Sequence, residues 1–250
     1  MISLNNVGKT YGKVTALQQT SLRVEQGSTT VLIGPSGCGK STILRLMIGL
    51  IVPDEGSVDI DGTTLSASNV LDLRRRIGYV IQDGGLFPHL TSEQNIVLMA
   101  KYLGKSQSEV DSRLNELSDL VHIPKETLSR YPDELSGGQR QRIGLMRALF
   151  LDPEILLLDE PLGALDPVTR SELQTELKSI FMRLKKTVVI VTHDMGEAAY
   201  LGTKIVLMRN GTIVQSGTLS ELWKTPIEPF VKDFINAQRS PLEQLVEVAK

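Results

Sequence analysis

The pattern of hydrophobic and polar residues along the chain predicts an alternation of strands and helices. Over residues 1–28 polar and apolar side chains alternate, as in SLRVEQG, which is typical of half-buried antiparallel strands. A helical pattern at 167–185 separates the apolar runs at 155–160 and 187–193, so we expect these two runs to form parallel strands. The short apolar runs that predict fully buried strands are TTVLIG at 29–34, RIGYVIQ at 76–82, ILLLDE at 155–160 and TVVIVTH at 187–193.

Helical patterns replace these strands between 87 and 150. Thr91 with Gln94, and Ser106 with Glu109, have the spacing of capping boxes at helix starts. We therefore expect a mostly helical insertion in this part of the chain. Its clearest apolar stripe at helical spacing is Val110, Leu114, Leu117 and Val121.

Two further segments predict hairpins. GSVDIDGTTL turns at Asp61-Gly62 and KIVLMRNGTIVQSG turns at Asn210-Gly211, both favoured dipeptides for tight turns between strands. Together with the buried runs, they predict an α/β protein with a mixed, mainly parallel sheet and an antiparallel β edge.

Composition and charge narrow the class of protein. The chain has 250 residues, of which 41% are hydrophobic and 22% charged, as in globular domains. Its formal net charge of −2 gives no basic footprint for nucleic acid. The single cysteine, Cys38, excludes a disulfide framework and fits a reducing compartment. With no apolar run near the ~18 residues of a membrane helix and no signal peptide, we expect a soluble, cytoplasmic chain.

One glycine-rich segment carries a specific chemical signal. GPSGCGKST, from Gly34 to Thr42, matches G-x-x-x-x-G-K-[ST] in full, between a buried strand and a helix. Its glycines let successive backbone N–H groups turn inward around phosphate oxygens. Lys40 can then reach the β and γ phosphates, and Ser41 can offer its hydroxyl to Mg²⁺. The flanking strand and helix argue against a glycine-rich turn without function.

Polar residues follow three other buried strands. Asp159 and Glu160 end the run ILLLDE, at the edge of an open α/β sheet where ligands bind. Asp159 is suited to hold Mg²⁺ through water, and Glu160 to polarise an attacking water. His193 is a candidate contact for a γ-phosphate, and Gln82 can touch Mg²⁺ or water. Alone, each of these residues would indicate no more than a solvated strand end.

A second candidate anion site lies in DELSGGQRQRIGLMRALF. Ser136, Gly137 and Gly138 open a predicted helix, and bare N–H groups at a helix start bind phosphate. One chain would thus carry two phosphate sites. We expect the basic residues that follow, Arg140, Arg142 and Arg147, to form a solvated helix face. For Cys38 we expect a passive position, with a pKa that the helix start could lower.

These motifs, in this order, resemble those of the ATP-binding subunits of ABC transporters over essentially the whole chain. The segment LSGGQ (Leu135–Gln139) separates this family from other P-loop proteins, and the GALD loop (Gly163–Asp166) and VTHD complete the match. The resemblance implies ATP and Mg²⁺ as ligands, with Tyr11 stacked on adenine. It assigns ATP to Gly34, Pro35, Ser36, Gly37, Cys38, Gly39, Lys40, Ser41 and Thr42, and Mg²⁺ to Ser41, Gln82 and Asp159, with Glu160 and His193 as catalytic residues.

The resemblance also explains why one chain has two anion sites. Subunits of this family pair head to tail as a homodimer, so that Ser136, Gly137, Gly138 and Gln139 meet the γ-phosphate on the partner chain's loop. The resemblance also implies that Asp166 lies at this dimer interface. The resemblance implies a single domain over 1–250 with a P-loop NTPase fold. Its parts are a RecA-like core with an antiparallel β part (1–86 and 151–218), a helical signature subdomain (87–150) and a helical tail (219–250). Many members of the osmoprotectant subfamily also carry paired CBS domains, but here we expect none.

At finer grain, GLFPHLT, LDPVTRSELQ, THDMGEA and FVKDF are similar to importer ATPases for glycine betaine, choline and related osmoprotectants. This implies integral permease subunits and a periplasmic or lipid-anchored solute-binding protein as partners, and a peripheral place on the cytoplasmic side of the cell membrane. No nucleic acid partner is expected. Segment 83–104 would receive the permease, with Leu86 and Phe87 either exposed there or buried in the core.

Three alternatives stay open. The importer could carry another small polar solute, such as an amino acid or an anion. A non-transport ABC protein would usually have two ATPase modules or a long coiled-coil insertion. A P-loop kinase or GTPase lacks LSGGQ, and a GTPase carries Asn-Lys-x-Asp, which this chain does not.

Overall fold

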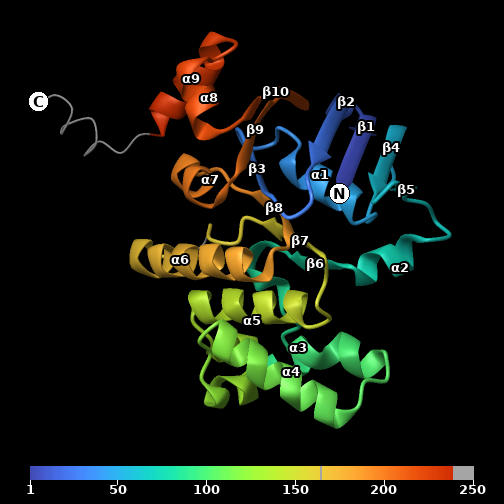
Figure 1. Cartoon of the computed structure of the whole chain (residues 1–250), viewed down its shortest axis with the longest axis vertical. Helices are drawn as coiled ribbons and strands as arrows, with labels where there is room; N and C mark the ends of the chain where they lie inside the picture. The colour runs from blue at the N-terminus through green and yellow to red at the C-terminus, as the bar shows by residue number, and fades with distance from the viewer. Residues whose placement is uncertain (164, 239–250) are drawn as a thin grey trace, which may run out of the picture.

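Two β-sheets and a set of helices make up the molecule (Figure 1). The structure is a computed structural model that describes residues 1–163 and 165–238. The smaller sheet is antiparallel, in the order β2-β1-β4-β5. Its strands are β1 (Ile2–Tyr11), β2 (Val14–Val24), β4 (Glu55–Ile60) and β5 (Thr63–Thr64).

The larger sheet has the order β10-β9-β3-β8-β7-β6 and is parallel except for β10. Both predicted hairpins form, with turns at Asp61-Gly62 and Asn210-Gly211. The predicted fold class, α/β with a mainly parallel sheet and an antiparallel part, is therefore confirmed. The strands are β3 (Thr29–Ile33), β6 (Ile77–Val80), β7 (Ile155–Asp159), β8 (Thr187–Val191), β9 (Lys204–Arg209) and β10 (Thr212–Gly217).

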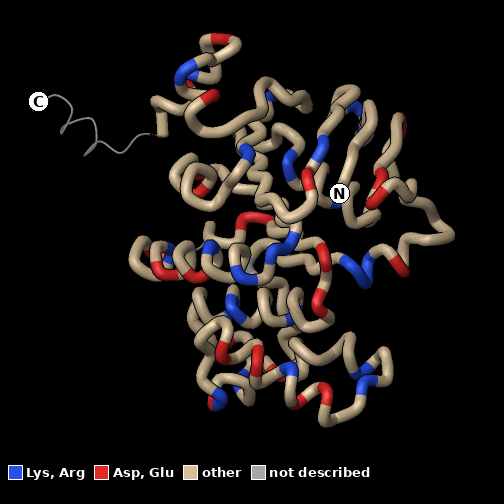
Figure 2. Tube along the Cα trace, in the orientation of Figure 1, with Lys and Arg blue, Asp and Glu red and all other residues tan. Residues whose placement is uncertain are grey.

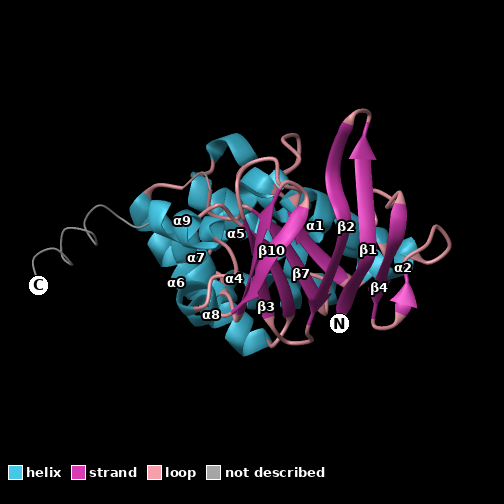
Figure 3. Ribbon diagram, turned by 90° about the horizontal axis from the view of Figure 1, so that it is seen from above, coloured by secondary structure: helices cyan, strands magenta, loops and turns pink. Residues whose placement is uncertain are grey.

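Helices cover the larger sheet, as the view from above shows (Figure 3). None of the helices in the described part of the chain is long and apolar enough to cross a membrane. The α-helices are α1 (Lys40–Met47), α2 (Val70–Arg75), α3 (Ser92–Tyr102), α4 (Gln107–Leu120), α5 (Gly137–Leu149), α6 (Pro167–Leu184), α7 (Met195–Leu201), α8 (Leu219–Lys224) and α9 (Pro229–Ala237). Short 3₁₀ turns are η1 (Gln82–Gly85), η2 (Lys125–Ser129) and η3 (Pro132–Glu134).

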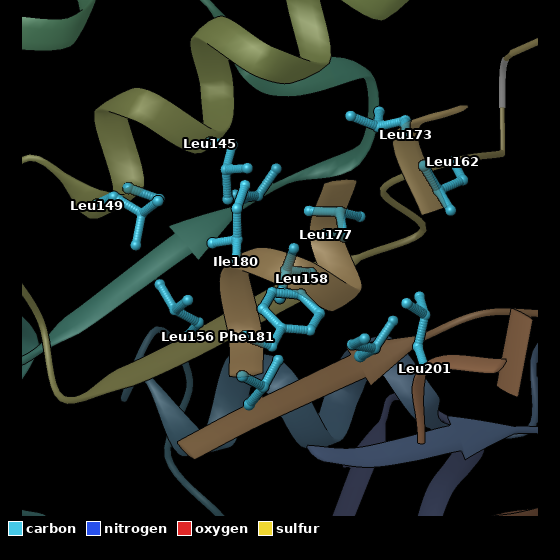
Figure 4. Packing of buried hydrophobic residues seen from close by; sticks show 14 of the residues in the cluster. Leu145, Leu149, Leu156, Leu158, Leu162, Leu173, Leu177, Ile180, Phe181 and Leu201 are labelled. Atoms are coloured by element: carbon cyan, nitrogen blue, oxygen red, sulfur yellow. The ribbon is translucent and has the colours of Figure 1, made fainter. Parts of the chain in front are cut away.

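The larger sheet separates two hydrophobic cores, because alternate residues of a strand point to opposite faces. On β7, Leu156 and Leu158 face the core formed with α5, α6 and α7, whereas Ile155 and Leu157 face the core around α1 and the smaller sheet. Figure 4 shows the first core, where leucines of α5 and β7 meet Phe181 of α6. This two-sided burial explains why the central strands read as unbroken apolar runs.

The segment between residues 87 and 150 contains helices α3, α4 and α5. Helices α3 and α4 lie at one end of the molecule, and α5 lies between them and α6 (Figure 1). Thr91 and Ser106 cap α3 and α4, and each forms the predicted capping box with Gln94 and Glu109. The predicted apolar stripe of α4 is buried.

The part of the predicted helical tail that the structure describes consists of two separate helices, α8 and α9. Thr225 ends α8 in a non-helical conformation just before Pro226, as expected for a residue that precedes proline. Pro229 then occupies the first turn of α9, where its missing N–H costs nothing. The rest of the predicted tail, 239–250, lies outside the described residues, as does Ala164 of the GALD loop.

Candidate functional site

The predicted site residues follow strands that are neighbours in the larger sheet. Strands β3, β8, β7 and β6 are adjacent and parallel, so their carboxyl ends share one edge. The glycine loop follows β3, Asp159 and Glu160 end or follow β7, and His193 follows β8. Topology alone thus gathers residues that are far apart in the sequence at the edge where α/β sheets bind ligands.

At two positions of the glycine loop, the backbone has a conformation and close contacts that only glycine allows. Gly34 and Gly39 have φ angles of 152° and 106°. A Cβ on Gly34 would lie 2.2 Å from the Met208 carbonyl oxygen, and one on Gly39 would lie 2.6 Å from that of Ala16. Gly39 is also the N-cap of α1, so the loop ends at a helix N-terminus, where anions are favoured.

Lys40 is folded back into the loop. Its Nζ donates to the carbonyl oxygens of Gly34, at 2.7 Å, and Pro35, at 3.0 Å, and the side chain is buried. Beside it lies a hollow of about 210 Å³. The hollow is lined by Ala16, Ser36, Gly37, Gly39, Lys40, Ser41, Thr42 and Glu160, and therefore by none of the segment 135–139.

Ser41 and Asp159, both predicted to hold Mg²⁺, are in direct contact. Ser41 Oγ donates to Asp159 Oδ1 at 3.0 Å. Burial raises the pKa of the Asp159 carboxyl, and the charge of Glu160 adds to the effect, while the Ser41 hydrogen bond opposes it. A buried carboxylate and a hydroxyl are hard oxygen donors of the kind that Mg²⁺ prefers, so these residues fit that cation.

Tyr79 of β6 is a neighbour of Asp159 that the sequence reasoning missed. Burial and the negative charge of Asp159 raise the pKa of its hydroxyl. The signal was present in the strand pattern, because Tyr79 is the one residue of IGYV that is polar at its tip. Nothing in that pattern, however, says that β6 lies next to β7.

Glu160 and His193 lie side by side. Glu160 has a φ of 46°, unusual for a residue other than glycine, and its N–H donates to the Val191 carbonyl of β8 at 3.0 Å. This bend brings Glu160 Oε2 to 3.5 Å from His193 Nδ1. Strain of this kind persists where the surroundings fix it and is common at functional sites. The Glu160 side chain is 26% exposed and the His193 side chain 59% exposed, so a ligand from solution can reach both.

Gln82 and Tyr11 are not joined to this cluster. Gln82 is exposed at the start of η1 and makes no hydrogen bond with Ser41 or Asp159, all three being described residues. Tyr11 is 43% exposed at the end of β1, on the hairpin whose other strand contributes Ala16 to the hollow. The Lys9 ammonium lies 5.7 Å from the centre of its ring.

Ser136 caps α5, as predicted. Ser136 Oγ accepts from the Gln139 N–H at 3.2 Å, and Gln139 Oε1 accepts from the Ser136 N–H at 3.0 Å. This reciprocal capping box leaves the N–H groups of Gly137 and Gly138 without a described partner. A Cβ on Gly138 would lie 2.7 Å from Thr169 Cγ2, so this helix start packs tightly on the first turn of α6.

The predicted solvated arginine face of α5 is wrong. Arg140 donates to the Leu135 carbonyl at 2.6 Å, and Arg142 pairs with Glu176 of α6 through two hydrogen bonds. Arg147 donates at 2.8 Å to the carbonyls of both Gly84 and Gly85 in η1. Burial lowers the pKa of Arg147. Spacing could not reveal the partners of Arg142 and Arg147, because these come from segments far away in the chain. Figure 2 shows basic and acidic residues interspersed along the trace.

Cys38 also differs from expectation. Its side chain is buried inside the loop, and burial raises the pKa of its thiol, although Lys40 nearby opposes the shift. The expected lowering by the helix start is therefore outweighed by the loss of hydration.

Leu86 and Phe87 were expected to be either exposed or buried in the core, and the structure shows one of each. Leu86 packs against the larger hydrophobic core, whereas Phe87 is 45% exposed. Helix α3 exposes an apolar row as well. That row consists of Leu98, Met99 and Tyr102, with Leu103 just after the helix.

Comparisons with known proteins agree with this arrangement. A family model described as "ABC transporter" matches residues 17–163. The chain is 47% identical over 240 residues to the choline transport ATP-binding protein OpuBA of Bacillus subtilis (strain 168), covering 96% of this chain and 63% of that protein. It is 45% identical over 235 residues to the sulfate/thiosulfate import ATP-binding protein CysA of Synechocystis, covering 94% of this chain and 65% of that protein.

A solved structure is similar at the level of the fold as well as the sequence. It is the ATP-binding cassette MJ0796 in a dimeric post-hydrolysis state bound to ADP and Pi, with a TM-score of 0.79 and 36% identity. The match covers 88% of this chain and 99% of that one. The chain spans less than two thirds of the length of the two curated relatives, at 63% and 65%.

Proposed function

The chain belongs to the ABC transporter family, and on that premise we propose that it is the ATP-hydrolysing subunit that powers an importer. One observation carries the proposal: Lys40, Ser41 and Glu160 line the same hollow. A cation, a hydroxyl and a carboxylate around a cradle of backbone N–H groups are the parts that phosphoryl transfer to water requires.

The glycine loop binds the phosphates of ATP in this proposal. Lys40 exchanges the carbonyls of Gly34 and Pro35 for β- and γ-phosphate oxygens, which are stronger partners for an ammonium group. Ser41 and Asp159, with Gln82, would hold Mg²⁺, which supplies positive charge against the charge that develops on the phosphates. Tyr11 would stack on the adenine.

Glu160 is the general base of the proposed reaction. Its carboxylate accepts a proton from a water molecule whose oxygen attacks the γ-phosphorus. The bond from that phosphorus to the β–γ bridging oxygen breaks, and ADP and phosphate leave. His193, at 3.5 Å from Glu160, orients the carboxylate and contacts the γ-phosphate.

The site is completed by a second copy of the chain. The hollow contains no residue of the Ser136–Gln139 helix start, and the N–H groups of Gly137 and Gly138 have no described partner. Two copies arranged head to tail would bring these groups to the γ-phosphate on the other copy, with Asp166 at the interface. The relative bound to ADP and Pi is dimeric, which supports this arrangement.

Permease subunits in the cell membrane are the proposed partners of this dimer. The core (1–86 and 151–218) would bind ATP, and the helical subdomain (87–150) would receive the permease at Phe87 and the apolar row of α3. Large exposed apolar patches mark interaction sites. A solute-binding protein outside the membrane would deliver the solute. The similarity to a choline transport protein favours quaternary-amine osmoprotectants as the solute.

The variant Glu160→Gln tests the enzymatic part of the proposal. The amide keeps the size of the side chain but cannot take a proton from water, so ATP should bind normally while hydrolysis stops. We expect the variant to accumulate as an ATP-bound dimer in size-exclusion chromatography with Mg-ATP. A variant that stays monomeric and still hydrolyses ATP would show that Glu160 is not the base.

The solute requires a separate experiment, because this chain does not contact it. Cells that lack the gene should lose uptake of radiolabelled choline or glycine betaine in high salt, and keep uptake of sulfate. The gene with Glu160→Gln should not restore uptake, whereas the wild-type gene should. Loss of sulfate uptake alone would favour the anion importer, in keeping with the 45% identity to a sulfate import protein.

A further inference from the structure

Arg170 connects two loops that follow different strands of the larger sheet, β7 and β8. It lies in the first turns of α6, next to α7 (Figure 1). Its Nη2 donates to the Leu165 carbonyl at 3.0 Å, in the loop that leads to Asp166. Its Nη1 lies 4.0 Å from Asp194 Oδ2, in the segment that follows β8. A single guanidinium group thus spans both loops.

Asp194 in turn organises the residues around His193. Asp194 Oδ1 accepts from the Glu197 N–H at 2.9 Å and so caps α7. The Asp194 N–H donates to Thr192 Oγ1 at 3.0 Å, and Thr192 Oγ1 donates to the buried Glu197 Oε2 at 2.5 Å. Since the chain is held at Thr192 and at Asp194, the backbone of His193 between them has little freedom.

The hydrogen bonds of Arg170 are incomplete. Its Nε is buried and finds no acceptor among residues 1–163 and 165–238. Buried donors are nearly always paired, so an unpaired one in the middle of a network calls for an explanation. Within the described residues, the network therefore has one donor without an acceptor, on the residue that also contacts the Leu165 carbonyl.

We propose that Arg170 is a positioning residue that fixes His193 relative to the loop ending at Asp166. A second copy that contacts this loop would then also set the position of His193 against Glu160. The inference rests on the proposed function, in which Asp166 meets the second copy. Networks of hydrogen bonds that join two elements are a physical route for such coupling.

The test uses Arg170→Met in the full chain, which removes the charge and donors but keeps the length of the side chain. Arg183→Met is the matched control, because Arg183 is an exposed arginine near the other end of α6. The chain has three histidines, so an NMR spectrum of the imidazole groups is simple, and His193→Gln identifies the signal of His193.

We expect Arg170→Met to shift or broaden the His193 signal of the ligand-free protein and to leave the other two histidine signals unchanged. Arg183→Met should alter none of the three. A His193 signal identical to wild type in Arg170→Met would overturn the inference. If Arg170→Met does not fold, Arg170→Lys replaces it, since lysine keeps the charge but cannot span both loops and should also displace the signal.

Hydrolysis provides the second measurement. Arg170→Met should lower kcat at least tenfold and leave ATP affinity within twofold of wild type, with Arg170→Lys in between. A lower kcat with an unmoved His193 signal would contradict a role through His193. If the wild-type protein hydrolyses no ATP, the proposed function fails, yet the NMR comparison of ligand-free proteins still decides whether Arg170 positions His193.

Discussion

Ser41 Oγ donates a hydrogen bond of 3.0 Å to Asp159 Oδ1, joining the end of the glycine loop to the end of β7 across 118 positions of the sequence. Ser41 lies in the first turn of α1, after the glycine loop that follows β3, and Asp159 is the last residue of β7. Asp159 is held there in a buried setting that disfavours its charge. Such a site costs stability in the free chain, which is a common consequence of function.

The variant Asp159→Asn should make that cost visible. Burial raises the pKa of Asp159 in the folded chain above the ordinary value of 3.8. The resulting destabilisation is absent below pH 3.8, where the carboxyl is protonated in both states, and grows as the pH rises through the folded pKa. We therefore expect Asp159→Asn to melt a few degrees above wild type at pH 7.5 without Mg²⁺ or nucleotide.

Calorimetry over a series of pH values checks this prediction. The difference in melting temperature between variant and wild type should shrink as the pH falls toward 3.8, the ordinary pKa of an aspartate. Mg²⁺-dependent hydrolysis should be lost in the same variant. A variant that melts below wild type at neutral pH would contradict the assigned effect of burial.

Arg147→Met tests the contact between α5 and η1. Methionine preserves the length of the side chain but leaves the carbonyls of Gly84 and Gly85 without their donors. We expect the free energy of unfolding to fall by about 2–3 kcal/mol, as for the loss of charged hydrogen bonds in a partly buried site. Urea denaturation measures the change, and the exposed Arg183→Met should alter stability by no more than about 0.5 kcal/mol.

Cys38 should be protected from thiol reagents in the folded protein. The thiol is buried and its pKa is raised, so little of the reactive thiolate is present or reachable at pH 7.5. As it is the single cysteine, the release of chromophore from a disulfide reagent reports it alone. The reaction should be much slower than that of the chain unfolded in guanidinium; equal rates in the two states would contradict the buried position.

The sequence predicted those parts of the molecule that depend on local patterns. Buried strands, hairpin turns and capping boxes each follow from a few neighbouring residues, and the carboxyl-end rule placed Asp159, Glu160 and His193 near the glycine loop. The contacts of Arg147 with Gly84 and Gly85, and of Arg170 with Asp194, could not be predicted in this way. They depend on which helix packs against which loop, and periodicity shows only that a position is polar.

Cys38 and the C-terminal helices show a second limit. For Cys38, a favourable helix start and an unfavourable burial compete, and the sequence reveals only the first. For the segment from 219, the helical pattern predicts a helical tail, and the break between α8 and α9 lies at Pro226 and Pro229.

The central claim is that two copies of the chain complete each other's sites, and mixing two inactive variants tests it most directly. Lys40→Ala removes the cation of the glycine loop, and Ser136→Arg blocks the helix start without touching that loop. In a mixed dimer one site has both lesions, and the other joins an intact glycine loop to an intact helix start.

The measurement is ATP hydrolysis of the two variants alone and mixed, with differently tagged chains to verify that mixed dimers form. Each variant alone should be inactive. The account predicts that activity returns on mixing, in proportion to the mixed dimers present. The contrary result is that verified mixed dimers hydrolyse no ATP and gain no stability from ATP at any mixing ratio of the two variants. In that case the site is completed within one chain, and the account is contradicted.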